Sequence, residues 1–127
     1  VLDDKLVEIN GLQIIGVDYK SSYDKISYEA ILANLNIDKN KPIILLRHVP
    51  DKMDVAPKFG IYLELCGHAD KGQLFPVQII EYFLYDGFQY GLKKSGNTMV
   101  YTSSGAGTWG PPMRILANPE IVRIKFE

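Results

Sequence analysis

Two apolar runs, each followed closely by a histidine, constrain the fold of this chain most. The apolar residues 43–46 precede Arg47-His48, and the run 61–65 leads through Cys66-Gly67 to His68. The four consecutive apolar residues 43–46 predict a strand covered on both faces. The run 61–65 also predicts a strand, although Glu64 makes its alternation of apolar and polar residues imperfect. In open α/β sheets, ligands bind at the carboxyl ends of the strands. We therefore expect both histidines at a binding edge.

A second polar group follows His68 two residues later, at Asp70. Side chains at positions i and i+2 point the same way when the backbone is extended. If this turn is extended, both side chains could therefore face one cation. The alternative for Asp70 is a turn aspartate that bonds its own backbone. The alternative for His48 is that it is an ordinary polar residue at the end of a strand and binds no metal.

Composition narrows the class of protein. The 127 residues suit one domain or a large part of one, and 46% hydrophobic with 23% charged residues is ordinary for a globular chain. Fourteen basic and 15 acidic residues give no global case for nucleic acid or an anionic membrane. The single Cys66 excludes an intramolecular disulfide. Since residue 1 is Val, other segments could precede it, and a cytoplasmic or a membrane-associated location both stay open.

The rest of the chain predicts a mixed α/β domain. Asn10-Gly11 between two apolar runs predicts a hairpin, and Ser27 predicts the N-cap of a helix. The period of residues 77–85 does not separate helix from strand. Further expectations are a helix with Ile31, Leu32 and Leu35 facing inward, a helical turn over 54–58, strands over 88–93 and 99–103, and a closing strand over 121–126. Antiparallel strands are thus expected in the last third.

Several motifs in register resemble one family. They are Leu-Leu-Arg-His-Val-Pro-Asp over 45–51, Gly-His-Ala-Asp-Lys-Gly-Gln over 67–73, Ser-Ser-Gly-Ala-Gly over 103–107, Arg114, and Pro-Glu-Ile over 119–121. Together they resemble the C-terminal half of calcineurin-like metallophosphoesterases, in the bacterial branch often found behind N-terminal membrane or export segments. The resemblance implies that residues 1–127 form a single domain, the mixed-sheet half of an α/β sandwich and the C-terminal portion of a longer catalytic domain.

In that family, two divalent ions clamp the phosphate, and the second half of the enzyme supplies three histidines. The resemblance places His48 and His68 at the first two of these positions and Asp70 at the third. A carboxylate favours harder ions than imidazole does, so Mn, Fe and Zn all stay candidates. Lys71 is a second departure, because the family usually has Gly there. The family's Asp-x-His, Gly-Asp and Gly-Asn-His motifs are not in this chain.

The resemblance implies the C-terminal part of a hydrolase that cleaves phosphomonoesters or phosphodiesters with metal-bound hydroxide. This chain alone is expected to be inactive and could lack the metal that the complete enzyme binds, and none of its residues is assigned a catalytic role. The alternative is a degenerate, non-catalytic binding or regulatory module that keeps the fold. A third interpretation is a small independent α/β protein with fortuitous motifs. An uncovered sheet edge or face also predicts that the chain could form a homo-oligomer.

Other residues have two readings each. Cys66 and His68 could form a thiolate–imidazole pair, but their spacing does not aim them at each other, and a buried small side chain fits Cys66 better. Gly105 and Gly107 could cradle a phosphate through backbone N–H groups or belong to a structural loop. Arg47 and Arg114 could bind phosphate oxygens or form ion pairs.

Overall fold

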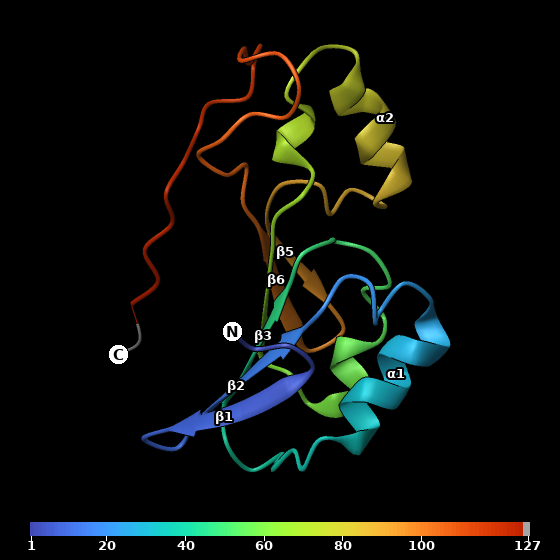
Figure 1. The fold of residues 1–127 in the computed structure, drawn as a ribbon, viewed down its shortest axis with the longest axis vertical. Helices are drawn as coiled ribbons and strands as arrows, with labels where there is room; N and C mark the ends of the chain where they lie inside the picture. The colour runs from blue at the N-terminus through green and yellow to red at the C-terminus, as the bar shows by residue number, and fades with distance from the viewer. Residues whose placement is uncertain (126–127) are drawn as a thin grey trace.

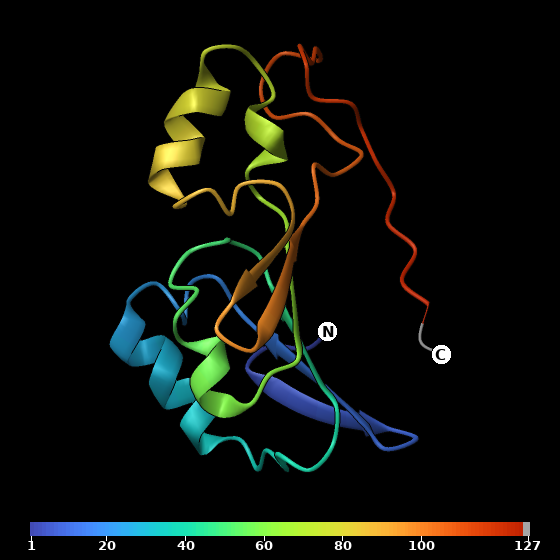
Figure 2. The same cartoon turned by 180° about the vertical axis from the view of Figure 1, so that it is seen from behind.

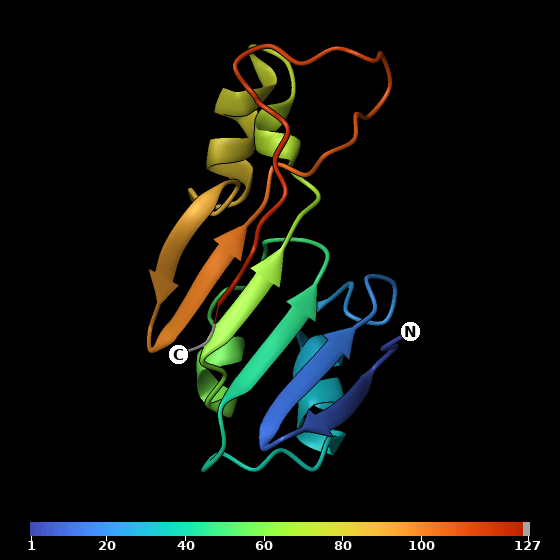
Figure 3. The ribbon, with the colours of Figure 1, turned by 90° about the vertical axis from the view of Figure 1, so that its left-hand side faces the viewer.

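Six strands form one mixed sheet in the computed structural model, which describes residues 1–125 (Figure 3). The strand order is β1-β2-β3-β4-β6-β5, in which β2, β3, β4 and β6 run parallel and the outer strands β1 and β5 are antiparallel to their neighbours. The expected α/β fold is confirmed. The strands are β1 Lys5–Ile9, β2 Leu12–Val17, β3 Ile43–Arg47, β4 Leu63–Cys66, β5 Gly91–Ser95 and β6 Thr98–Thr102.

The predicted hairpin at Asn10-Gly11 joins β1 to β2. Both residues have left-handed backbone angles, with φ of 50° at Asn10 and 82° at Gly11. Two left-handed residues are what a two-residue hairpin turn needs to match the twist of its strands. Ile9 therefore pairs directly with Leu12 across the turn.

Helix α1 (Lys25–Asn34) begins earlier than Ser27 predicts, because Asp24 is its N-cap. The Asp24 carboxylate accepts hydrogen bonds from the Ser27 backbone N–H at 2.9 Å and from the Ser27 hydroxyl at 2.7 Å. An acidic side chain at this position satisfies a free N–H and complements the positive end of the helix. Ser27 is thus the donor in the cap rather than the capping residue.

Helix α1 and the short helix η1 (Ala56–Phe59) cover one face of the sheet (Figure 1). Leu32 is fully buried there, and Ile31 and Leu35 pack against the same core, as predicted. Tyr28 is fully buried as well, which the sequence pattern did not indicate. The buried cluster comprises Ile15, Val17, Tyr28, Leu32, Ile43, Leu45, Val55, Ala56 and Ile61.

The opposite face of the sheet is only partly covered. Leu46 keeps 38% of its surface exposed, so the prediction that residues 43–46 are covered on both faces is wrong at this residue. The C-terminal segment descends along this side of the molecule (Figures 1 and 2). The predicted closing strand is not formed over 121–125, because no strand pairs with that stretch, and Phe126 lies outside the described residues. Self-association through this face stays a prediction.

Helix α2 (Val77–Leu84) and the short helix η2 (Asp70–Gly72) lie beyond the carboxyl ends of the parallel strands (Figures 1 and 3). The segment whose period was ambiguous is therefore helical. No residue of α2 is buried, although most of them are apolar. Over residues 1–125, the structure has no helix with the length and apolar character needed to cross a membrane.

The two faces of β3 give a matched test of the core. Leu45 is fully buried against α1, whereas its neighbour Leu46 is 38% exposed on the other face. We expect Leu45→Ala to lower the free energy of unfolding by about 2–5 kcal/mol, because it leaves a cavity. Leu46→Ala should cost less than about half of that, since less apolar area is lost. Urea unfolding of both variants measures this, and equal losses would contradict the burial described here.

Candidate metal site

His48 and His68 meet at the carboxyl-terminal edge of the sheet. His48 directly follows β3, and His68 comes two residues after the end of β4. The Nε2 atom of His48 lies 3.0 Å from Nδ1 of His68, and the two ring centroids are 4.8 Å apart. The parallel pairing of the strands therefore brings together two imidazoles that are 20 residues apart in sequence.

A backbone hydrogen bond continues the strand pairing up to the two histidines. The last registered pair of β3 and β4 is Leu46 with Leu65, and the Gly67 N–H then donates to the His48 carbonyl at 3.0 Å. The chain turns sharply immediately afterwards, since His68 has a φ of 70°. Such an angle is uncommon for a residue with a side chain and often occurs at functional sites.

Two tyrosines flank the histidine pair, which the sequence did not predict. The Tyr19 ring centroid lies 6.2 Å from the centroids of both histidines, and the Tyr85 centroid lies 6.3 Å from that of His68. Tyr19 follows β2 by two residues, at the same edge as His48 and His68. The rule that placed the histidines at strand ends would also have found Tyr19.

The surroundings of His68 favour its neutral form. Burial and the neighbouring His48 lower the pKa of His68, while the negative charges of Asp70 and Asp51 oppose this shift. A metal ion binds the neutral imidazole, so the lowered pKa extends the pH range over which His68 can act as a ligand.

Asp70 is directed toward a different partner. Its Oδ1 lies 3.9 Å from Nη2 of Arg114, whose Nε also donates to the Gly107 carbonyl at 2.9 Å. Over residues 1–125, no three His, Cys, Asp or Glu side chains gather in a way that could hold a metal ion. The structure therefore brings His48 and His68 together without adding Asp70 to the group. All three nevertheless line one cavity of about 630 Å³.

The backbone of the turn after His68 favours a glycine at position 71. Lys71 has a left-handed φ of 56°, which glycine adopts at no steric cost. The Lys71 ammonium lies 4.4 Å from the Tyr90 ring centroid, a cation–π contact that offsets part of this cost. At Gly72 a side chain is excluded, because an added Cβ would lie 2.3 Å from the Gln78 Cα.

The glycine-rich loop is held in place by the same turn. The Gln73 side chain accepts from the Trp109 N–H at 2.6 Å and donates to the Trp109 carbonyl at 2.7 Å. Arg114 binds the Gly107 carbonyl, as described above. Arg114 therefore forms an ion pair, which is one of the two roles expected for it. The hydrogen bonds of the glycine-rich loop are to neighbouring protein groups, as in a structural loop.

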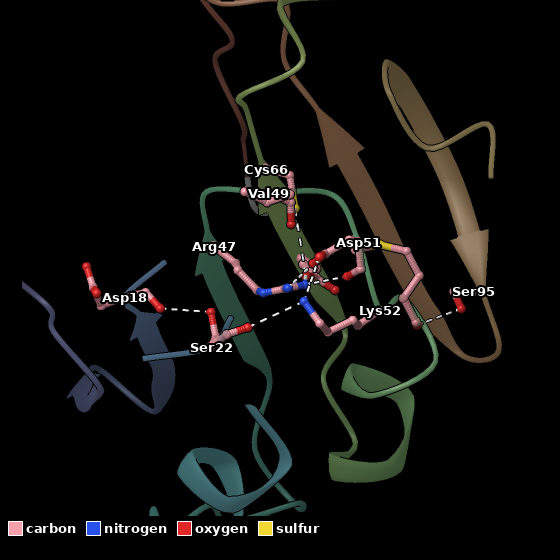
Figure 4. Close-up of polar contacts among 10 residues, drawn as sticks. Asp18, Ser22, Arg47, Val49, Asp51, Lys52, Cys66 and Ser95 are labelled. Atoms are coloured by element: carbon pink, nitrogen blue, oxygen red, sulfur yellow. Dashed lines mark hydrogen bonds and ion pairs between the residues drawn. The ribbon is translucent and has the colours of Figure 1, made fainter. Parts of the chain in front are cut away.

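A buried charge cluster supports the segment that carries His48 (Figure 4). The Arg47 guanidinium bonds both the carboxylate and the carbonyl of Asp51, and its Nη1 lies 3.6 Å from Glu64 Oε1. Its Cζ also lies 4.2 Å from the Tyr28 ring centroid. Lys52 adds a 2.6 Å bond to the Asp51 carboxylate. The last residue of the His-x-Pro-Asp motif is thus held from two sides.

Burial governs the ionisation of this cluster. Glu64 is fully buried, and burial raises its pKa to about 7, although Arg47 acts in the opposite direction. Burial also raises the pKa of the Cys66 thiol. The Cys66 Sγ contacts the Val49 carbonyl and Glu64 Oε1, at 3.9 Å and 3.7 Å. Cys66 is therefore a buried, protonated side chain directed away from any pairing with His68.

The raised pKa of Glu64 predicts a pH-dependent stability. The folded state binds this proton more tightly than the unfolded state, so the contribution is complete below the ordinary glutamate pKa and is lost as the pH rises toward 7. We expect the free energy of unfolding to fall between about pH 5 and about pH 8 by roughly 1–3 kcal/mol from this group.

Chemical denaturation of Glu64→Gln across this range should give a flatter profile than the wild type. Some slope should remain, because burial also raises the pKa of Glu81 to about 7. Glu29→Gln is the matched control, since Glu29 is a surface partner of Lys58. A Glu64→Gln profile as steep as that of the control would contradict the assignment.

Comparison with known proteins gives relatives over nearly the whole chain. A metallophosphoesterase of Helicobacter pylori strain J99 is 35% identical over 99% of this chain, and one of Campylobacter jejuni is 35% identical over all of it. One of Aquifex aeolicus is 36% identical, also over the full chain. The chain spans 35%, 34% and 50% of the lengths of these relatives.

No family model matches the sequence, and no solved structure is significantly similar to it. These three relatives carry the printed name metallophosphoesterase and align with this chain at 35–36% identity over nearly its whole length. The motifs around His48 and His68 are the ones that resemble the calcineurin-like branch. The chain therefore belongs to the calcineurin-like metallophosphoesterases.

Proposed function

We propose that the protein carrying this chain hydrolyses phosphate esters with divalent metal ions, and that His48 and His68 are two of the ligands. The observation that carries the proposal is the 3.0 Å distance between His48 Nε2 and His68 Nδ1. Two metal–nitrogen bonds of about 2.0–2.1 Å at an angle of roughly 90–110° place the nitrogens about 3 Å apart. The pair therefore fits two neighbouring coordination positions on one ion.

Asp70 is proposed as the third donor from this chain. It lines the same cavity as both histidines, and its charge acts on the pKa of His68. Its ion pair with Arg114 is long, at 3.9 Å, and leaves carboxylate lone pairs free for a ligand. A set of two imidazoles and one carboxylate is compatible with Mn, Fe or Zn.

The bound ions would neutralise charge on the phosphate and activate water. The residues of this chain contribute in other ways. His48 and His68 fix the ions relative to the sheet edge, and Arg47 keeps the His48 segment in place through Asp51. Tyr19 and Tyr85 lie beside the imidazoles, with ring centroids 6.2 Å and 6.3 Å from those of the histidines they face. The remaining ligands would come from parts of the protein outside this chain.

A second candidate function is a non-catalytic binding or regulatory module. Two observations favour it: Asp70 contacts Arg114 rather than the histidines, and residues 1–125 contain no complete metal cluster. Under this alternative, Asp70 and Arg114 stabilise the turn and the glycine-rich loop, and the histidine pair has no metal. Metal affinity and catalysis distinguish the two functions.

Substitution of the histidines tests the proposal. In the complete protein, His48→Ala and His68→Ala should each weaken Mn²⁺ or Zn²⁺ binding by roughly 100-fold or more, since loss of even an outer partner of a ligand costs about 10–100-fold. Hydrolysis of bis(p-nitrophenyl) phosphate should fall with the affinity. Isothermal titration calorimetry and initial rates measure the two effects.

Asp54→Asn is the matched control, because Asp54 is an exposed carboxylate bound to Lys25 on the helical side of the molecule. Asp70→Asn separates the two roles of Asp70. Reduced metal affinity would support it as a ligand, whereas unchanged affinity with reduced stability would limit it to the contact with Arg114. A complete protein that binds neither ion and hydrolyses no phosphate ester would establish the non-catalytic alternative.

A further inference from the structure

Two hollows of different character meet at His68. The smaller one, of about 230 Å³, is bordered by the charged side chains of Arg47, Lys52 and Asp51, and Tyr19, Ser22 and Tyr23 also line it. The larger one, of about 630 Å³, extends from His48 and His68 toward α2 and the glycine-rich loop. A ligand group held at the histidine pair therefore has a hollow with charged walls on one side and a second, larger space on the other.

The larger hollow is predominantly apolar. Four aliphatic side chains line it from α2 and the segment just before it, and an indole and a proline ring line it from the glycine-rich loop. These six residues are Leu74, Val77, Ile80, Leu84, Trp109 and Pro111. Its volume falls within the range of about 300–1,000 Å³ that is typical of small-molecule sites.

The charges around the larger hollow are unsuited to an anion. Asp70 and Glu81 line it, and none of its described lining residues is Lys or Arg. Burial also raises the pKa of Glu81 to about 7, which keeps part of this carboxyl neutral near neutral pH. A phosphate would be repelled from this space, whereas the smaller hollow offers two cationic side chains, Arg47 and Lys52, beside Asp51, the single carboxylate among the described residues that line it.

The wall opposite α2 is fixed rather than loose. Gln73 is almost fully buried and bonds both the N–H and the carbonyl of Trp109. The loop that carries Trp109 is also tied to Arg114 through Gly107. Both contacts are to the backbone, so they hold the part of the loop that carries the indole beside the space in front of α2.

We propose that the larger hollow binds an uncharged apolar group of the phosphate ester, such as an alkyl chain or an aromatic ring. This inference rests on the proposed function, which places the phosphorus at the histidine pair. The ester bond then lies at the junction of the two hollows, with its phosphate toward Lys52 and its apolar group between Ile80 and Trp109. The preferred substrates are thus phosphate esters of apolar alcohols rather than of sugars or nucleosides.

A series of p-nitrophenyl phosphodiesters that differ only in the second ester group tests this inference in the complete protein. With methyl, butyl, hexyl and octyl esters below their micelle concentrations, kcat/KM should rise by roughly four-fold per added methylene until the hollow is filled. A phenyl ester distinguishes aromatic from aliphatic preference. An unchanged kcat/KM from methyl to octyl would overturn the inference while leaving the proposed function intact.

Neighbouring isoleucines on α2 provide the matched control. Ile80 lines the hollow, whereas Ile79 does not, and both are more than half exposed, at 61% and 51%. Ile80→Asn should flatten the dependence on chain length, and Ile79→Asn should leave it unchanged. If both substitutions flatten it equally, the apolar face of α2 acts as one surface, as for a membrane or a protein partner, and the hollow is not the binding site.

Binding without hydrolysis gives an independent readout. Octyl phosphate should shift the Trp109 emission, taken as the difference between the wild type and Trp109→Phe, whereas methyl phosphate should not. Ile80→Asn should weaken this response and Ile79→Asn should preserve it. Failure to hydrolyse even the methyl ester would reject the proposed function, and the emission titration would still decide whether the hollow accepts apolar groups.

Discussion

The parallel pairing of β3 and β4 is the constraint on which the site depends. Parallel strands end at the same edge, so residues that follow them in sequence become neighbours in space. Here the pairing extends one step past the strands through the bond from Gly67 to His48, and the imidazole of His68 follows at once. The close approach of the two rings is therefore a result of the sheet register. The segment that connects the two strands only needs to be long enough to allow this pairing.

Beneath this edge, the protein buries charges that would be more stable in water. Arg47 and Glu64 are almost fully removed from solvent, and their contact of 3.6 Å compensates only part of the cost of desolvation. The stronger bonds of Arg47 are to Asp51, in the segment that follows His48. The cluster thus holds one loop in position at a cost in folding stability. The left-handed backbone of His68 is a second local feature of this edge that costs stability.

The sequence was sufficient where local chemistry and sheet rules agreed. Asn10-Gly11 specified its hairpin, and the apolar runs before His48 and His68 specified two parallel strands with a common edge. It was insufficient where the outcome depended on distant partners. The alternating residues 121–125, for example, pair with no strand. The error at α1 was a local one, since Asp24 caps the helix and Ser27 donates to it.

The candidate site shows the same division. The convergence of His48 and His68 follows from strand order, whereas the contact between Asp70 and Arg114 joins residues 44 positions apart that no local pattern connects. The role of Tyr28 beside Arg47 was also beyond local reasoning, since a helical tyrosine is ordinarily a packing residue. Long-range polar contacts are specified by the assembled fold, and a single sequence carries little direct information about them.

Under the proposed function, the two bonds from Gln73 to Trp109 separate the residues that would hold the metal from those that would select the substrate. The strands and turns that present the imidazoles belong to the sheet, but the indole wall belongs to a surface loop that is held by the buried amide of Gln73 and by Arg114. Insertions or exchanges within that loop could reshape the neighbouring space without disturbing strand register. Relatives could thereby diverge in the compounds they accept while the reacting centre is inherited unchanged.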